Sequence, residues 1–303
     1  MKIATTTNDF KFYCNTDEER IRELHRAGFR YIDLSMYSWT PESEYMQENW
    51  RDAVQRIKDL ADELGMQFVQ AHSQGGNPLS KDSRHVDFLL KATLRSIEIC
   101  EMLGIPNTVV HNGRAAGLSK AEWFEKNKAF YEKLFPTMER CNVNVLCENS
   151  TKANMGDCYF INNGKDMREF IDFVGHPQIH GCWDTGHANC EGSQYDEIMA
   201  VGEALYAIHY NDNHGAADDH VAPFLGTLNH DEIFNALIDV GFKGCFTLEC
   251  DSTLNRAGKR RQFCGGKGDL KLAEPQLFMQ RHIEAMMYDT AQWMLESYGI
   301  LDR

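Results

Sequence analysis

The sequence predicts a closed (β/α)₈ barrel, the TIM-barrel architecture, formed as a single domain over residues 1–303. Short apolar or β-branched runs alternate with long amphipathic stretches along the whole chain, which is typical of parallel strands joined by crossover helices. Eight such runs in 303 residues suit a closed barrel better than an open sheet. No break in composition and no Pro/Ser-rich linker divides the chain, so we expect one domain.

The expected strands follow one another at fairly regular intervals. They are residues 2–7, 30–35, 66–73, 107–113, 142–150, 178–188, 205–212 and 244–251. Helical spacing of apolar residues predicts helices over residues 16–28, 49–65, 86–104 and 121–141, and a last helix that begins near Pro275. Several helices are expected to end at a glycine C-cap, namely Gly28, Gly65, Gly104 and Gly241. Residues 252–275, rich in Gly, Lys and Arg, are interpreted as an extended loop.

The composition is ordinary for a globular protein, with 43% hydrophobic and 25% charged residues. The formal net charge of −14 repels polyanions, so nucleic acid is not an expected partner. The one modest basic cluster, "RAGKRR" at residues 256–261, is interpreted as a solvated loop. A small-molecule substrate is the partner expected from the site described below, and self-association into a homo-oligomer is left open.

We expect neither a secretion signal nor a membrane-spanning segment in this sequence. Its start, "MKIATTTNDF", lacks a basic segment followed by an apolar run, and no stretch is apolar for long enough to cross a bilayer. The ten cysteines are scattered and form no CxxC pair, so we expect mostly reduced, structural thiols. Together these features predict a cytoplasmic protein with no membrane partner.

Polar side chains stand at the C-terminal ends of the predicted strands, where the active site of such a barrel lies. They follow the third to the eighth strand in turn: His72, His111, Glu148, Asp184 with His187, His209 and Glu249. Asp218 and His220 follow in the loop after the seventh strand. All of them offer nitrogen or oxygen donors suited to a divalent metal ion.

Two of these residues, Glu148 and Glu249, come directly after apolar runs ("VNVLC" and "CFTL"). Burying a carboxylate without a partner costs several kcal/mol, so the pair requires a compensating positive charge. A bound cation would supply it. The neighbouring Cys182, Cys190 and Cys250 are interpreted as bystanders, because thiolates select softer metals than the oxygen donors around them do.

The stretch "GCWDTGHANCEG" at residues 181–192 is explained by the same site. Asp184 would end its strand pointing into the mouth of the barrel, and His187 would turn back toward the same centre. Gly186 is expected to permit the sharp turn between them. Trp183 should face the other side of the strand and pack in the core.

With these motifs the chain resembles the sugar phosphate isomerase/epimerase superfamily, the xylose isomerase-like barrels that include ketose 3-epimerases, inosose dehydratases and type-IV apurinic endonucleases. The similarity spans essentially the whole chain. It rests on "CENS", "WDTGHA", "IHYND" followed by "DDHVAPFLGTLNHDEIFNAL", and "TLEC". The motifs are fairly specific to the superfamily and poorly specific to any one activity.

The resemblance implies a metal site and a set of substrate contacts. One Mn²⁺, Mg²⁺, Co²⁺ or Zn²⁺ ion would be held by Glu148, Asp184, His209 and Glu249. His187 would contact a substrate hydroxyl, and His72, His111 and His220 complete the expected substrate-binding set. The endonuclease-like members hold three zinc ions, whose additional ligands resemble His72, His111, His187, Asp218 and His220, so the number of metals stays open. The chain departs from the ketose epimerases at "ADDHV", where they carry an arginine.

The chemistry expected of such a site is isomerisation or epimerisation of a small sugar or sugar derivative through an enediolate. The cation would act as a Lewis acid, and Glu148 and Glu249 would serve as general base and general acid on the two faces of the intermediate. Dehydration of a keto-polyol through the same enolate is a close alternative. A trinuclear zinc phosphodiesterase of the apurinic endonuclease kind is a further alternative, supported by the donors and opposed by the acidic charge.

Overall fold

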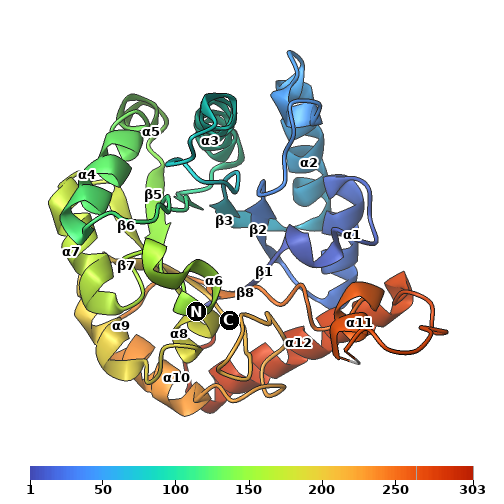
Figure 1. Ribbon diagram of the computed structural model, residues 1–303. Helices are drawn as coiled ribbons and strands as arrows, with labels where there is room; N and C mark the ends of the chain where they lie inside the picture. Colours follow the sequence, from blue (N-terminus) through green and yellow to red (C-terminus); the bar gives the residue numbers. More distant parts are fainter. Residues whose placement is uncertain (264, 303) are drawn as a thin grey trace.

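The computed structural model describes residues 1–263 and 265–302, and it confirms the predicted barrel. Eight parallel strands form one sheet in the order β7-β6-β5-β4-β3-β2-β1-β8. Helices surround the sheet, and the two ends of the chain lie beside each other, where Asp302 N donates a hydrogen bond to Met1 O (3.0 Å) (Figure 1). The strands are β1 (Ile3–Thr6), β2 (Tyr31–Ser35), β3 (Gln67–His72), β4 (Asn107–Val109), β5 (Asn144–Glu148), β6 (Ile179–Asp184), β7 (Leu205–His209) and β8 (Phe246–Leu248).

The ring closes between β7 and β8 through Tyr210. Tyr210 N donates to Thr247 O (2.7 Å), and Glu249 N donates to Tyr210 O (3.1 Å). These bonds accompany a parallel bridge between Tyr210 and Leu248. Because His209 and Glu249 stand on either side of this closure, the same backbone bonds hold two predicted ligands next to each other.

The helices follow the strands in the expected alternation. They are α1 (Asp17–Ala27), α2 (Trp50–Leu64), α3 (Ser83–Leu103), α4 (Lys120–Tyr131), α5 (Phe135–Cys141), α6 (Lys152–Met155), α7 (Gly164–Val174), α8 (Thr185–Asn189), α9 (Tyr195–Val201), α10 (His230–Asp239), α11 (Ala257–Phe263) and α12 (Leu277–Ser297). As predicted, α1, α2 and α3 end at glycines in the left-handed conformation, Gly28 (φ 109°), Gly65 (φ 64°) and Gly104 (φ 71°). Among the described residues, no helix combines the length and hydropathy needed to cross a membrane.

Two predicted segments differ from the structure. The single helix expected over residues 121–141 is broken into α4 and α5, because Pro136 stands at the start of a new helix and cannot continue the preceding one. The segment 252–275, expected to be a loop, contains α11 in its described part. That helix includes most of the basic cluster interpreted as a solvated loop. The nine cysteines among the described residues are free thiols, as expected.

Side chains alternate between the two faces of each strand, which divides the core in two. The outward faces pack against the helices in one large hydrophobic cluster that contains Trp183. A smaller separate cluster of Val109, Leu146, Cys182 and Ala207 lies on the other face, inside the barrel. The inward residue two positions further along each of these strands is His111, Glu148, Asp184 or His209. The apolar layer therefore lies directly beneath the predicted ligands.

Candidate metal centre

The C-terminal ends of β5, β6, β7 and β8 bring four predicted ligands together. Glu148, Asp184, His209 and Glu249 each offer one donor atom, and these atoms all lie within 4.8 Å of one another. His209 Nδ1 lies 2.5 Å from Glu148 Oε1 and 3.4 Å from Glu249 Oε2. Three carboxylates and one imidazole that offer oxygen and nitrogen donors within this distance suit a divalent cation.

A second group of donors adjoins the first through Glu148. His72, His111 and Glu148 again place one donor each within 4.8 Å of one another. His111 Nε2 lies 2.7 Å from Glu148 Oε2 and 3.1 Å from His72 Nε2. Glu148 thus reaches both groups, with one carboxylate oxygen directed toward each.

A third group adjoins the first through Asp184 and includes His187 and His220. Asp218 joins these histidines: its Oδ2 lies 3.1 Å from His187 Nε2 and its Oδ1 lies 3.0 Å from His220 Nε2. The structure therefore brings every predicted site residue to one rim, as three overlapping groups of donors. Their roles in catalysis and binding stay predictions.

Backbone carbonyl groups orient three of the histidines in the same way. The Nδ1–H group of His72 donates to Ser73 O (2.9 Å), that of His187 to Asn149 O (2.9 Å), and that of His220 to Glu249 O (3.0 Å). Each ring therefore directs Nε2 into the rim. This arrangement, in which the second ring nitrogen is fixed by a carbonyl, is typical of metal-binding histidines.

The histidines and carboxylates of the rim shift one another's pKa values. Burial would raise the pKa of Glu148, but the charge of His209 and hydrogen bonds from His111, His209 and His72 outweigh it and hold that pKa well below its usual range. Burial would lower the pKa of His187, but Asp184 and Asp218 raise it to about 10. Without a cation the rim thus retains protons on imidazole, and an entering metal ion competes with them.

The stretch that ends β6 builds its part of the site by close packing. Asp184 caps α8 by accepting a hydrogen bond from His187 N (2.6 Å). Gly186, expected to permit a sharp turn, lies within α8 without a positive φ; a Cβ there would lie 1.8 Å from Asn211 Oδ1, so this close approach requires glycine. Trp183 faces the opposite way, as predicted, and its indole nitrogen donates to Gln194 Oε1 (3.0 Å).

Sequence reasoning missed Asn211 as a site residue. Its Nδ2 donates to Asp184 Oδ2 (2.8 Å), which fixes the orientation of a predicted ligand. The available signal was its place in "HYND", two residues after His209 and hence on the same side of the chain. Tyr37 completes the wall, with its ring centroid 5.1 Å from that of His72 and 5.6 Å from that of His111.

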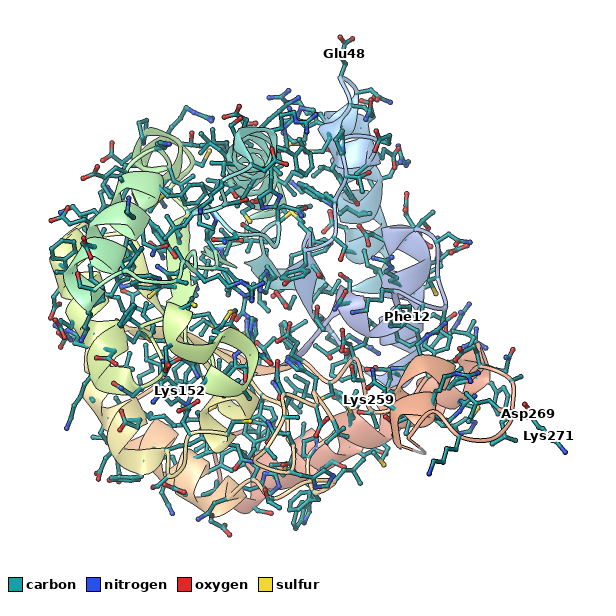
Figure 2. The ribbon with its side chains drawn as sticks, in the orientation of Figure 1. Phe12, Glu48, Lys152, Lys259, Asp269 and Lys271 are labelled. Carbon is teal, nitrogen blue, oxygen red and sulfur yellow. The ribbon has the colours of Figure 1, made fainter. Side chains whose placement is uncertain are left out.

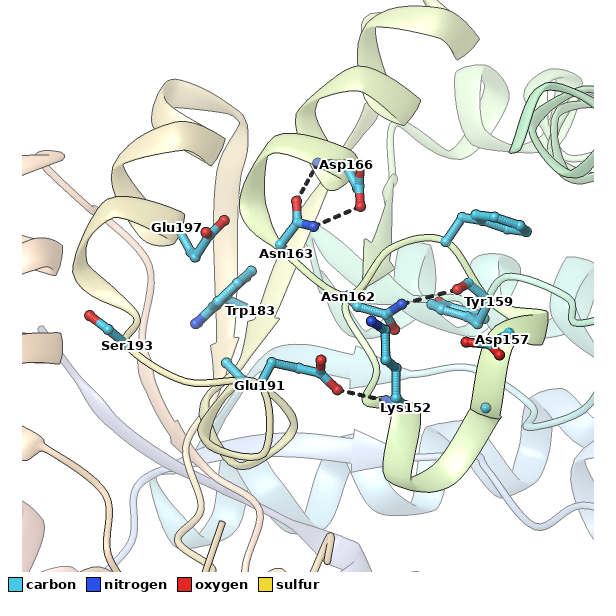
Figure 3. A pocket seen from close by; sticks show the side chains of 13 residues that line it. Lys152, Asp157, Tyr159, Asn162, Asn163, Asp166, Trp183, Glu191, Ser193 and Glu197 are labelled. Carbon is cyan, nitrogen blue, oxygen red and sulfur yellow. Dashed lines mark hydrogen bonds between the residues drawn. The ribbon is translucent and has the colours of Figure 1, made fainter. Parts of the chain in front are cut away.

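The donors open into a cavity of about 300 Å³, whose lining includes Tyr37, His72, His111, Glu148 and Glu249. A different cavity of about 440 Å³ lies between the loops that follow β5 and β6, and none of the predicted site residues lines it. Figure 3 shows that its walls are already bonded to one another: Lys152 N donates to Glu191 Oε1 (2.7 Å) and Asn162 Nδ2 to Tyr159 O (3.0 Å). Trp183 lines this 440 Å³ cavity, on the face of β6 away from Asp184.

Comparison with known proteins identifies the family. Residues 21–263 match the family described as xylose isomerase-like TIM barrel, and the chain belongs to it. The uncharacterized protein y4fM of Sinorhizobium fredii is 26% identical over 257 residues, which cover 75% of this chain and 78% of that protein.

Solved structures share the fold at low identity. D-psicose 3-epimerase from Clostridium cellulolyticum H10 superposes with a TM-score of 0.74 at 17% identity, over 97% of this chain and 99% of that one. The IolI protein with a bound zinc atom gives a TM-score of 0.74 at 16% identity, over 98% and 99% of the two chains.

Proposed function

We propose that this protein is a divalent-metal-dependent isomerase or epimerase of a small sugar or sugar derivative. The observation that carries the proposal is the group formed by Glu148, Asp184, His209 and Glu249, whose donor atoms lie within 4.8 Å of one another at the barrel mouth. Membership of the xylose isomerase-like family and the shared fold of sugar epimerases agree with it.

These four residues would hold one Mn²⁺, Mg²⁺, Co²⁺ or Zn²⁺ ion. When bound, the ion supplies Lewis-acid polarisation of the substrate carbonyl and of its neighbouring hydroxyl. Burial of Glu148 and His209 excludes water from the ligands, which strengthens every electrostatic interaction there.

Glu148 and Glu249 are assigned the proton transfers. They enter from β5 and from the end of β8, both close to His209 Nδ1, and we infer that a substrate bound against them loses a proton to one carboxylate and receives one from the other. Two groups on opposite faces permit inversion at the carbon, whereas one group would return the proton to the face it left. His187 and His111 lie beside this space as hydrogen-bond partners for substrate hydroxyls.

Solvent exchange tests the proposal directly. Protein loaded with Mn²⁺ is incubated in D₂O with a panel of free ketoses and aldoses, beginning with D-fructose, and deuterium at carbons next to the carbonyl is followed by NMR. We expect incorporation with the metal-loaded protein and none after chelation. Absence of exchange on every ketose and aldose tried would overturn the proposal. Formation of an unsaturated keto product would instead indicate the dehydratase.

The alternative function, phosphodiester hydrolysis at three zinc ions, would use the donors around the central group. The groups containing His72 with His111, and His187 with His220, each adjoin the central four ligands. The formal net charge of −14 opposes a DNA substrate. Elemental analysis separates the two functions: we expect about one metal per chain, whereas about three zinc ions together with cleavage of abasic DNA would favour the phosphodiesterase.

A further inference from the structure

A second cavity adjoins the metal centre on the side of α1 and α2. It measures about 670 Å³ and is lined by residues of the loops that follow β1 and β2. It shares Asn8, Lys11, Ser35 and Ser38 with the 300 Å³ cavity that contains the metal centre. The two cavities are therefore compartments of one cleft, and the compartment without the predicted ligands is the larger one.

Aromatic side chains line this second compartment. Trp39 is half-buried, lines the compartment and stacks on Tyr45, with ring centroids 5.2 Å apart and an interplanar angle of 29°. Phe12, which Figure 2 shows between α1 and α11, is 53% exposed although the Arg256 guanidinium lies over its ring, 4.3 Å from the centroid. Large exposed aromatic rings at the edge of a polar cleft are typical of ligand binding.

The polar groups of the compartment suit hydroxyl groups. Its lining includes Asn8, Asn15, Ser35, Ser38 and Ser43, whose amides and hydroxyls both donate and accept hydrogen bonds. An aromatic face beside such groups matches a pyranose ring, which presents C–H bonds on its faces and hydroxyl groups around its edge.

The charges of the compartment disfavour a phosphate group. Its two cationic side chains are already engaged: Lys11 Nζ lies 2.5 Å from Asp251 Oδ2, and Arg20 Nη1 lies 3.0 Å from Asp17 Oδ1. The lining also carries the carboxylates of Asp17, Glu18 and Glu44, of which Glu18 and Glu44 share the single guanidinium of Arg56. A phosphorylated ligand would meet more negative than positive charge, whereas a neutral glycosyl group would not.

We propose that this compartment is a subsite for a neutral glycosyl residue attached to the reacting sugar, and that the substrate class is a keto-disaccharide or a related ketose glycoside. This inference rests on the proposed function, since the reacting ketose occupies the metal centre. The glycosyl ring extends past Asn8 and Ser35 onto Trp39. The ketose unit itself occupies the 300 Å³ compartment, whose lining includes Glu148 and Glu249.

The test compares isomaltulose and lactulose, two glycosyl-fructoses, with D-fructose on Mn²⁺-loaded protein. Deuterium exchange gives kcat/KM for each sugar, and calorimetry gives its Kd. We expect at least about 10-fold preference for a glycosyl-fructose, and we expect Trp39→Ala to remove most of this preference. Trp39→Phe should restore part of it. Trp293→Ala, which removes a 60% exposed tryptophan on α12, is the matched control and should leave the preference unchanged.

Two results separate this inference from the proposed function. Equal values for fructose and the glycosyl-fructoses, with no effect of Trp39→Ala on their ratio, would overturn the subsite while exchange continued. Binding of isomaltulose that depends on Trp39, with no exchange on any sugar, would support the subsite and overturn the proposed function. If neither binding nor exchange distinguishes these sugars, the subsite is excluded.

Discussion

Two buried glutamates of this barrel have opposite surroundings, and the contrast explains which buried carboxyl group is ionised and which is protonated. Glu148, at the end of β5, is surrounded by His72, His111 and His209, which hold its pKa well below the usual range against the effect of burial. Glu284, on α12, lies beside Asp9 and Gln280. Burial raises the pKa of Glu284 to about 8, although hydrogen bonds with Gln280 and Asp9 oppose the shift.

The difference teaches that burial alone does not identify a functional carboxylate. Both side chains are almost completely buried. Glu148 remains an anion because the rim supplies positive partners, and an anion is what a cation site needs. Glu284 holds a proton at neutral pH, and its contacts serve the packing of α12 against the first strand and its loop.

The largest expected effect is the loss of activity when Glu148 is made neutral. Glu148→Gln removes a predicted base and ligand while conserving size, so we expect solvent exchange of the substrate proton to fall by about 10³-fold or more. The same substitution at the other buried glutamate, Glu284→Gln, is the control and should retain near wild-type exchange. Equal losses of exchange in both variants would show that burial, and not the surrounding histidines, determines which glutamate is needed for activity.

A smaller effect is expected in the pH dependence of stability. Because the folded pKa of Glu284 lies above its usual value of 4.5, its contribution is fully present below pH 4.5 and is lost as the pH rises through about 8. Urea unfolding of metal-free wild type and Glu284→Gln, measured from pH 5 to pH 9, should show a fall in the free energy of unfolding that is larger in the wild type by a few kcal/mol. Burial also raises the pKa of Asp9, so the variant keeps a smaller fall of its own. Parallel curves for the two proteins would contradict this.

Metal binding should distinguish the two glutamates again. A cation present at about 100 times its Kd stabilises the folded state by about 2.7 kcal/mol, so we expect Mn²⁺ to raise Tm by roughly 5 °C. Glu284→Gln should keep this shift and Glu148→Gln should lose most of it. Differential scanning fluorimetry with and without chelator measures both, and a shift retained in Glu148→Gln would place the ion elsewhere.

The smallest effect concerns Asn211, which orients Asp184 from outside the ligand set. Asn211→Ala should weaken Mn²⁺ binding by about 10-fold, because Asp184 loses a hydrogen bond that fixes its direction. Gln280→Ala, which removes the corresponding partner of Glu284, should leave the Kd for Mn²⁺ unchanged. Calorimetric titration of the two variants makes the comparison, and equal effects on the Kd would exclude an orienting role.

The local pattern of the sequence predicted the strands and the polar residues at their ends. The direction of a parallel strand determines at which end of the barrel its last inward-facing side chain lies. The convergence of Glu148, Asp184, His209 and Glu249 follows from that direction alone. The pair formed by Asp9 and Glu284 gave no signal, because the two residues are far apart in the sequence and belong to no motif. The break at Pro136 was missed because apolar spacing continues across it.

The central claim is that a cation lies among Glu148, Asp184, His209 and Glu249. A crystal grown with Mn²⁺ and measured at a wavelength where manganese scatters anomalously tests it most directly. We predict one strong anomalous peak in contact with oxygen or nitrogen atoms of all four residues. A structure with manganese bound only elsewhere, or with none bound at a saturating concentration, would contradict the account.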